Sequence, residues 1–370
     1  MPHRIRKEHG EHCRGTSSAL KPRDMRRVLI PSDNRDFVPQ LAAAYRRQGW
    51  EVAVGALNFD LQVGSYDVVH FQWPEELTSW EPPTSARIAE IASTLDAWAG
   101  KSRLLLTVHN LYPHRHHGDP RCREFLEVFY ERMEVLAHFT EASSVQVAGE
   151  FPITATRRNV VTGFFNFDSL LPAGAREDPG EARRRLGIAE DEFVVLSFGA
   201  LRDWAEVELV RKGFDGARLP GKRLLMAGRY QEFGPVWRQR WRRWSWNRWL
   251  KRVNAVTKAG FVPDAEVSGL VEASDVLMVP RLDVLNSGLP ALAATFGKIF
   301  VVPDCGGLPE IASGTDNPVY RSGDAASLAA ALEQASRLDR KAMAQRNRQL
   351  ADSWSWDQIV RVGLDALGFS

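Results

Sequence analysis

A short polar turn, Asn286, Ser287 and Gly288, separates an apolar run from an apolar segment of helical pattern, Leu289 to Phe296. The first turn of a helix carries free backbone N–H groups and the positive end of the helix dipole, and both favour an anion. Asn and Ser are good helix caps, and Gly allows a bulky anion to approach the backbone. The turn therefore predicts a phosphate site. The alternative is a capped helix that binds nothing.

A second candidate for an anion contact is Arg202, which follows the apolar run 192–201. A guanidinium at the end of a buried strand can bind a diphosphate through two parallel hydrogen bonds. Such a contact contributes roughly 1.5–3 kcal/mol. The alternative is a surface arginine on a loop, but the position after a buried strand favours the diphosphate.

Two apolar runs in the first half of the chain end on a histidine, His70 and His109. Histidine titrates near neutral pH, so at the edge of a sheet it can bind a sugar hydroxyl or act near a reacting centre. Asn110 and His114 follow closely behind His109 and favour function there. The alternative for both histidines is a loop position without a ligand.

Trp73 and Glu75 follow His70 and form a candidate wall for a sugar acceptor, because sugars stack on aromatic faces. Trp73 could equally cover the sheet. His114, His116 and His117 lie close together, but no Cys or carboxylate set with zinc spacing accompanies them. We therefore predict no metal site.

The elements that must position these residues alternate between apolar runs and amphipathic segments. The first half shows strand patterns at 27–32, 51–57, 67–74, 103–110 and 144–148, with helical patterns at 33–50, 88–98 and 125–139. The second half shows a helix at 181–187, strands at 192–202 and 222–228, a strand edge, helix and strand within 261–280, and a helix and strand at 289–302. This alternation predicts parallel sheets with helices on both faces, and ligands that bind beyond the carboxyl ends of the strands.

The length of 370 residues suits two domains. We expect a basic, disordered leader at 1–25, an amino-terminal Rossmann-like domain at 26–166, a linker rich in Pro, Gly, Asp and Ser at 167–182, a carboxyl-terminal Rossmann-like domain at 183–350 and a closing helix at 351–370. The fold class is therefore α/β, with two doubly wound domains facing across a cleft.

Composition narrows the function classes. The first 27 residues hold eight Lys/Arg and three Asp/Glu and so have a net charge of +5. Because the whole chain has a net charge of +2, the remaining residues have a net charge of −3. A basic groove for nucleic acid is not indicated. No run of 18 apolar residues predicts a transmembrane helix. The three widely spaced cysteines fit no disulfide framework and favour the cytoplasm.

The segment 236–253 carries five of the twelve tryptophans and seven Lys/Arg. Trp237, Trp241 and Trp244 lie four and three residues apart, on one helical face. Three interpretations remain open: a helix that packs its tryptophans on the domain, an interfacial helix at Trp237–Arg252 that contacts an anionic membrane, and an anionic-polymer surface.

The runs RRRLGIAEDEFVVLSFGALR, GFVPDAEVSGLVEASDVLMVP and SGLPALAATFGKIFVVPDCGGLPE resemble the donor-binding domain of GT-B glycosyltransferases, in the mostly retaining bacterial group that assembles exopolysaccharides and glycoconjugates. DVVHFQWPE and TVHNLYPHR resemble the acceptor domain of that group. The resemblance covers nearly all of residues 25–370. It implies a nucleotide-diphosphate sugar donor without a cofactor, a saccharide or lipid-linked saccharide acceptor, and His109 near the transferred sugar.

The chain departs from the group at two motifs. Arg202 matches the group's Arg-x-x-Lys-Gly, but Ala205 and Glu206 occupy the Lys-Gly positions. The group's pair of glutamates aligns with Val284 and Leu292, both apolar. Asn286, Ser287 and Gly288 could replace part of that function, and Glu310 is a candidate for a ribose contact. The departures also leave open a degenerate homologue that binds sugar nucleotide or acts as a scaffold. A sugar-nucleotide epimerase of the same shape and a membrane- or polymer-binding protein are further alternatives.

Overall fold

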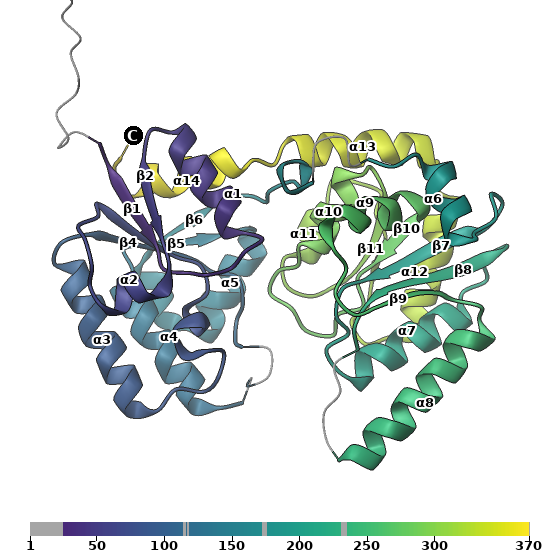
Figure 1. Ribbon diagram of the computed structural model, residues 1–370, viewed down its shortest axis with the longest axis horizontal. Coiled ribbons are helices and arrows are strands. Elements are labelled where there is room, and N and C mark those ends of the chain that lie inside the picture. The colour runs from purple at the N-terminus through teal and green to yellow at the C-terminus, as the bar shows by residue number, and fades with distance from the viewer. Residues whose placement is uncertain (1–24, 114–115, 117, 172–175, 231–234, 370) are drawn as a thin grey trace, which may run out of the picture.

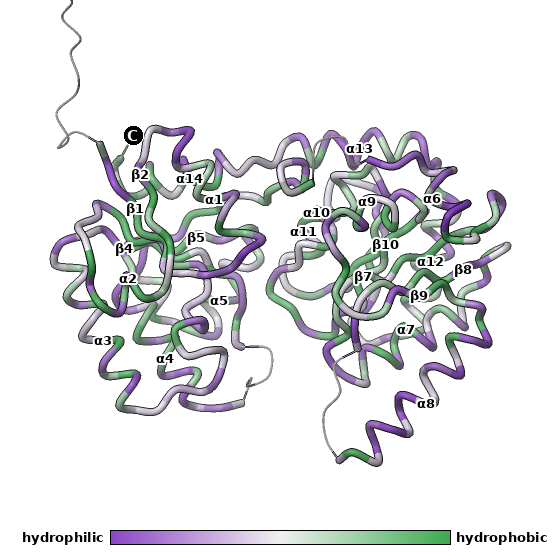
Figure 2. Tube along the Cα trace, in the orientation of Figure 1, coloured by the Kyte–Doolittle hydropathy of each residue, from purple (hydrophilic) through white to green (hydrophobic). Residues whose placement is uncertain are grey.

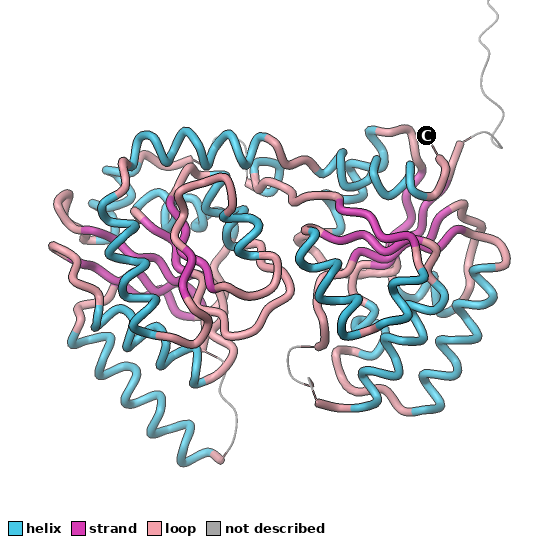
Figure 3. The backbone as a smooth tube through the Cα atoms, turned by 180° about the vertical axis from the view of Figure 1, so that it is seen from behind, coloured by secondary structure: helices cyan, strands magenta, loops and turns pink. Residues whose placement is uncertain are grey.

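The computed structural model describes residues 25–113, 116, 118–171, 176–230 and 235–369, and the predicted leader lies almost wholly outside them (Figure 1). The described residues form two α/β domains side by side, each with one parallel sheet between helices (Figures 1 and 3). This confirms the predicted fold class of two doubly wound domains. The domain boundaries themselves stay a prediction.

The amino-terminal sheet has the strand order β2-β1-β3-β4-β5-β6, and every pair is parallel. Its strands are β1 (Arg27–Ile30), β2 (Glu51–Val54), β3 (Val68–Phe71), β4 (Arg103–Thr107), β5 (Val135–His138) and β6 (Arg158–Val161). Its helices are α1 (Val38–Arg47), α2 (Ala56–Asp60), α3 (Ser85–Ala99), α4 (Pro120–Arg132) and α5 (Glu141–Glu150), with short 3₁₀ turns η1 (Pro74–Thr78) and η2 (Pro152–Thr156).

The carboxyl-terminal sheet has the order β12-β11-β10-β7-β8-β9, again all parallel. Its strands are β7 (Phe193–Phe198), β8 (Lys222–Gly228), β9 (Val256–Ala259), β10 (Val276–Met278), β11 (Ile299–Pro303) and β12 (Val319–Tyr320). Its helices are α6 (Pro179–Leu186), α7 (Trp204–Gly216), α8 (Val236–Arg252), α9 (Asp264–Ala273), α10 (Leu289–Thr295), α11 (Leu308–Ala312), α12 (Ala325–Arg337) and α13 (Arg340–Asp352).

Strands buried on both faces explain why their apolar runs are almost continuous in sequence. In β7, Val194 and Leu196 join one apolar cluster while Phe193 and Val195 join another on the opposite face. Figure 2 shows the same concentration of hydrophobic residues along the strands of both sheets. The first of these clusters continues into the amino-terminal domain, so the two domains share one apolar layer.

The last helix, α14 (Trp356–Ala366), packs on the amino-terminal domain after α13 has run along the carboxyl-terminal one (Figure 1). Trp356 of α14 contacts the ring of Phe37, with centroids 4.7 Å apart, and donates a hydrogen bond to the carbonyl oxygen of Asn166 at 3.2 Å. Asp357 pairs with Arg47 of α1 at 2.7 Å. The closing helix thus returns to the amino-terminal domain.

Two predicted elements of the first half are wrong. The helix expected over 125–139 ends at Arg132, and Val135–His138 forms β5. The strand expected at 144–148 lies inside helix α5, whose start is fixed by a capping box between Thr140 and Ser143. Strand β6, at the edge of the sheet, was not predicted, because its residues are half-buried or exposed and carry no apolar run.

No helix among the described residues is long and apolar enough to cross a membrane.

Candidate functional site

The strand order of the carboxyl-terminal sheet places a crossing point between β7 and β10, because the chain leaves β7 toward β8 on one side and returns to β10 on the other. Ligands of doubly wound sheets bind outside the carboxyl ends of the strands at this point. Arg202 lies just beyond β7 and Arg281 just beyond β10. The fold therefore brings two guanidinium groups to the edge where a ligand is expected.

Arg281, Glu206 and Arg202 form one network at this edge. The Nη1 atom of Arg281 donates to Glu206 Oε2 at 2.8 Å and to the carbonyl oxygen of Ala200 at 2.9 Å. Glu206 Oε2 also accepts from the backbone N–H of Arg202 at 2.7 Å. The Arg281 side chain is only 9% exposed, and its Nε has no hydrogen-bond partner among the described residues. Glu206 thus binds the guanidinium of Arg281 and the backbone of Arg202.

The electrostatics of the network favour an added anion. Burial and, to a smaller extent, the nearby Arg281 lower the pKa of Arg202 to about 10. Burial raises the pKa of Glu206, opposed by Arg281. Arg202 remains protonated at neutral pH. The negative charge of a diphosphate would compensate both for the lost solvation of Arg202 and for its repulsion from Arg281. Sequence reasoning found Arg202 but missed Arg281 and the ionic role of Glu206.

The turn predicted to bind phosphate is arranged differently. Gly288 is the N-cap of α10 and no side chain caps the helix, although Ser287 Oγ accepts from the N–H of Leu289 at 3.3 Å. Asn286 turns toward the amino-terminal domain, with its Nδ2 3.5 Å from the carbonyl oxygen of Val108. The ring of Phe167 covers the side of Gly288 where a Cβ would stand. The expected capping by Asn286 is therefore wrong, because its side chain faces the other domain.

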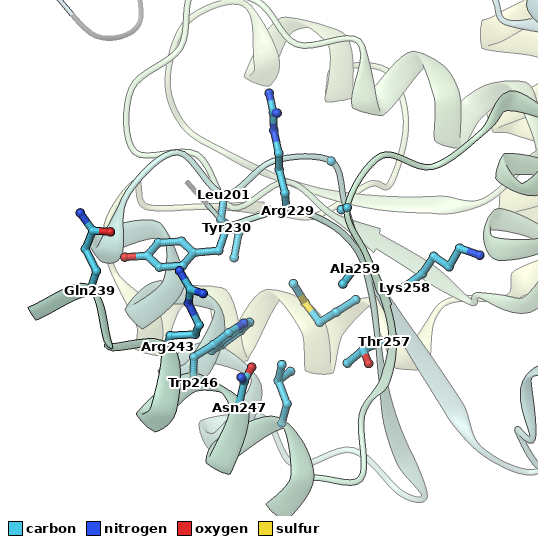
Figure 4. Close-up of a pocket in the computed structure, with 15 residues that line it drawn as sticks. Leu201, Arg229, Tyr230, Gln239, Arg243, Trp246, Asn247, Thr257, Lys258 and Ala259 are labelled. Carbon is cyan, nitrogen blue, oxygen red and sulfur yellow. The ribbon is translucent and has the colours of Figure 1, made fainter. Parts of the chain in front are cut away.

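A pocket of about 500 Å³ opens between α8 and the carboxyl ends of β7, β8 and β9, and Leu201, the residue before Arg202, is part of its lining. Figure 4 shows Trp246 and Asn247 on α8 across from Thr257 on β9, with Arg229 directed away from α8. This pocket could not be predicted from the turn motifs, because α8 and β9 are distant from them in sequence.

A glycine allows the strand ends at this pocket to approach. Gly228 has a φ of +139°, and a Cβ there would overlap the carbonyl oxygen of Gly199 at the end of β7. A larger residue at position 228 would therefore force β7 and β8 apart at the mouth of the pocket.

The carboxyl edges of the two sheets face each other through direct contacts. The carboxylate of Glu310 accepts from the backbone N–H of Glu141 at 3.0 Å and of Ala142 at 2.8 Å. Glu310 thus caps α5 of the other domain, where the helix dipole favours a negative charge. A Cβ on Gly307 would overlap Thr140 Oγ1, so only glycine allows this approach. The predicted ribose contact of Glu310 would require both capping bonds to break.

His109 lies two residues beyond the carboxyl end of β4 and is half-buried. Its ring stacks on Trp73 at a centroid distance of 4.0 Å and meets Phe37 edge-on at 5.0 Å. Its Nε2 is 3.0 Å from Gln72 Oε1 and donates to it when the ring is neutral. Burial lowers the pKa of His109 to about 3. The neutral ring suits the orientation of a hydroxyl better than the transfer of a proton.

His70 does not lie at the edge of the sheet. It is 1% exposed, and its ring nitrogens are hydrogen-bonded to Tyr45 Oη at 2.9 Å and to Thr107 Oγ1 at 2.8 Å. Burial lowers its pKa to about 3. The acceptor-side prediction for His70 is corrected, because β3 continues one residue beyond it and both nitrogens are used within the core.

Glu75 lies in η1, is 3% exposed and interacts with the side chain of Asn110. Burial raises its pKa to about 7, although hydrogen bonds, including that of Asn110, act in the opposite direction. The two predicted acceptor-side residues are thus brought together, behind the stacked pair Trp73 and His109. His114 lies outside the described residues, and its neighbour His116 contacts Glu81 at 3.3 Å.

The raised pKa of Glu75 predicts a pH-dependent stability. Its folded pKa exceeds its unfolded value of 4.5, so its contribution is full below pH 4.5 and is lost as the pH rises through about 7. Glu75→Gln removes this dependence. We expect the difference in unfolding free energy between variant and wild type to change by about 3 kcal/mol between pH 4.5 and 8. Urea unfolding across this range measures it.

Glu124→Gln is the control, because Glu124 is an exposed glutamate of α4. It should leave the pH profile unchanged. A Glu75→Gln profile parallel to that of the wild type would contradict the raised pKa.

No group of three or more His, Cys, Asp or Glu side chains in the described part of the chain is arranged to hold a metal ion.

Residues 178–350 match the family model described as "Glycosyl transferases group 1". The match spans most of the carboxyl-terminal domain. No curated protein matches the chain in sequence.

Solved structures establish the GT-B fold over 93% of the chain. Anabaena HepE, in complex with UDP and glucose, has a TM-score of 0.64 at 14% identity, over 93% of this chain and 99% of that one. Sucrose-phosphate synthase from Thermosynechococcus elongatus has a TM-score of 0.66 at 13% identity, over 93% and 98%. The catalytic domain of starch synthase IV from Arabidopsis thaliana, bound to ADP and acarbose, has a TM-score of 0.66 at 13% identity, over 93% and 99%.

The two apolar residues that align with the glutamate pair, Val284 and Leu292, are part of the core of the carboxyl-terminal domain. Val284 is 5% exposed and Leu292 is 3% exposed. The positions that align with the glutamate pair therefore offer no polar side chain.

Proposed function

We propose that the protein is a glycosyltransferase that moves a hexosyl group from a nucleotide-diphosphate sugar to a saccharide or lipid-linked saccharide, with retention, in polysaccharide or glycoconjugate biosynthesis. The observation that carries the proposal is the pair Arg202 and Arg281 at the crossing point of the group 1 domain. Negative charge grows on the diphosphate as the glycosidic bond breaks, and fixed cations at that place lower the barrier.

The donor is proposed to lie across the carboxyl edge of the second sheet. The pocket of about 500 Å³ has the size of ordinary small-molecule sites and suits the nucleoside. Asn286, Ser287 and Gly288 border the path toward the other domain and would lie beside the transferred sugar. Structures of the same fold bind UDP with glucose, or ADP, so a uridine or adenosine diphosphate sugar is the first class to test.

The acceptor is proposed to enter from the amino-terminal side. His109 and Trp73 present a stacked aromatic surface at the junction of the domains. Since His109 is neutral and Nε2 is engaged by Gln72, its Nδ1 can accept a hydrogen bond from the acceptor hydroxyl. Glu75 and Asn110 support this wall from behind. We propose a cytoplasmic enzyme, because the widely spaced cysteines fit a reducing compartment.

A second function is favoured by the buried Val284 and Leu292. A homologue that has lost the glutamate pair would bind a sugar nucleotide without transferring the sugar, and would act as a scaffold.

One experiment separates the two functions. Purified protein is titrated calorimetrically with UDP, GDP and ADP, and each nucleotide sugar is then assayed for transfer and for donor hydrolysis. Tight binding with turnover supports the enzyme, and tight binding without turnover across saccharide acceptors supports the scaffold. Absence of binding to every nucleotide would overturn both.

A further inference from the structure

Helix α8 is fixed to its domain along one face. Trp246 and Trp249 are 7% and 4% exposed, and their rings stack at a centroid distance of 4.8 Å. The Nε1 of Trp249 donates to Asp215 Oδ1 at 3.0 Å, and Arg252 pairs with Asp215 at 2.6 Å. These contacts hold α8 on α7, so its opposite face has a defined orientation.

Three further tryptophans, Trp237, Trp241 and Trp244, lie on that opposite face and are 67%, 60% and 58% exposed. Trp246 follows Trp237 by nine residues, which is two and a half helical turns, so their side chains point in opposite directions. The exposed tryptophans span seven residues, or about 10 Å of helix. Packing on the domain buries Trp246 and Trp249. In the row, Trp241 approaches the ring of Trp204 on α7, with centroids 6.5 Å apart, and all three side chains stay more than half exposed.

The charge of α8 is strongly positive. The helix carries six Arg, one Lys and no Asp or Glu, while the chain as a whole has a net charge of +2. The residues outside α8 therefore sum to −5. Arg238 lies over the ring of Trp237 at 5.1 Å, and Arg248 over that of Trp244 at 5.5 Å. Cations beside exposed indole rings match the interface of an anionic bilayer, where the rings enter the headgroup region and the cations meet lipid phosphates.

The shape of the surface favours a bilayer over a nucleic acid. Single strands bind in positively charged grooves that follow the backbone for several nucleotides. Here the aromatic and basic residues lie on one convex helix, whose first turns stand away from the domain body at its lower edge (Figures 1 and 3). A flat, laterally extended partner can meet such a helix along its full exposed face.

We propose that the face of α8 formed by Trp237, Trp241, Trp244 and Arg248 docks the protein on an anionic lipid bilayer. The docking is independent of sugar transfer. It would also bring the protein to a surface where lipid-linked acceptors reside.

Sedimentation of the full chain with vesicles tests the proposal. Wild-type protein is expected to bind phosphatidylcholine vesicles containing 30% phosphatidylglycerol at least tenfold more tightly than pure phosphatidylcholine, and to lose most of this binding at high salt. Trp241→Ser with Trp244→Ser should weaken binding at least tenfold. Its matched control, Leu57→Ser with Leu61→Ser, alters side chains that are 71% and 69% exposed on the other domain and should bind like wild type.

Two double variants with reversed charge test the contribution of the arginines. Arg240→Glu with Arg248→Glu should weaken vesicle binding at least tenfold, whereas Arg321→Glu with Arg337→Glu, at two side chains that are each 76% exposed, should not. Unchanged thermal unfolding and unchanged nucleotide binding show that the tryptophan variant is folded and that the donor site is separate.

Three results would overturn the proposal. Wild-type binding that is equal on neutral and anionic vesicles, or absent, would remove the lipid partner. Full binding by the tryptophan variant would assign the attraction to the basic leader instead. Binding of a short single-stranded RNA that competes with vesicles and is tighter than they are would make the surface a nucleic-acid site.

Discussion

Arg202→Ala is expected to weaken binding of the preferred nucleoside diphosphate roughly 10- to 150-fold, which corresponds to a loss of about 1.5–3 kcal/mol. The wild-type guanidinium is largely desolvated and lies near Arg281, and both effects lower its pKa. Its own contact with the carbonyl oxygen of Asp283, at 3.2 Å, is long and neutral. An arriving diphosphate therefore gives Arg202 a charge-assisted partner, which is stronger than a hydrogen bond to a neutral carbonyl oxygen.

Calorimetric titration of the variant beside the wild type measures this loss. Arg202→Lys should lie between the two, because it keeps the charge but not the paired geometry of the guanidinium. Arg321→Ala, far more exposed, is the control and should bind as wild type does. Unchanged affinity in Arg202→Ala would place the diphosphate elsewhere and would remove the main support for the proposed donor site.

The sheets could be predicted because their strands are buried on both faces and read as apolar runs of four to seven residues. The same rule failed at β5, where Val135–His138 follows directly on an amphipathic helix and prolongs its apolar pattern. It failed at β6 for the opposite reason, since an edge strand with exposed Arg158 and Asn159 has no apolar signal. The periodicity of hydrophobic residues alone does not show where a helix ends and a short strand begins.

The candidate site could be predicted only in part, for a topological reason. Arg202 stood out because it follows a strand directly, but its partner Arg281 comes from a strand that is about eighty residues away in sequence. Only the strand order shows that β7 and β10 are neighbours. The same limit applies to Glu310, whose partners are backbone N–H groups of the other domain. A backbone partner leaves no mark in the sequence.

His70 and His109 show how the point at which a strand ends decides between a core position and a site position. Both follow an apolar run, yet β3 extends through Phe71 while β4 stops at Thr107. The result is one histidine with both nitrogens bonded inside the core and another that faces the junction beside Trp73. The sequence pattern cannot distinguish them, because the difference lies in where the hydrogen-bonded ladder ends.

Glu206→Gln is expected to destabilise the carboxyl-terminal domain by about 3 kcal/mol. The side chains of Glu206 and Arg281 are 3% and 9% exposed, so the pair is buried and solvent does not screen it. Removal of one partner leaves a buried guanidinium without its counter-charge, at a cost of about 3–5 kcal/mol, and the oxygen kept by Gln places the expected value at the lower end. Urea unfolding followed by tryptophan fluorescence measures the change.

The double variant Glu206→Leu with Arg281→Met separates stability from function. Replacing both members of a buried pair by apolar residues of similar volume is often neutral, so stability should return to within about 1 kcal/mol of wild type. Nucleotide binding should stay weak, because one of the two guanidinium groups is absent. Recovery of both stability and nucleotide affinity would mean that Arg281 only balances Glu206. Recovery of stability alone would identify Arg281 as the second cation that replaces the lysine missing at position 205.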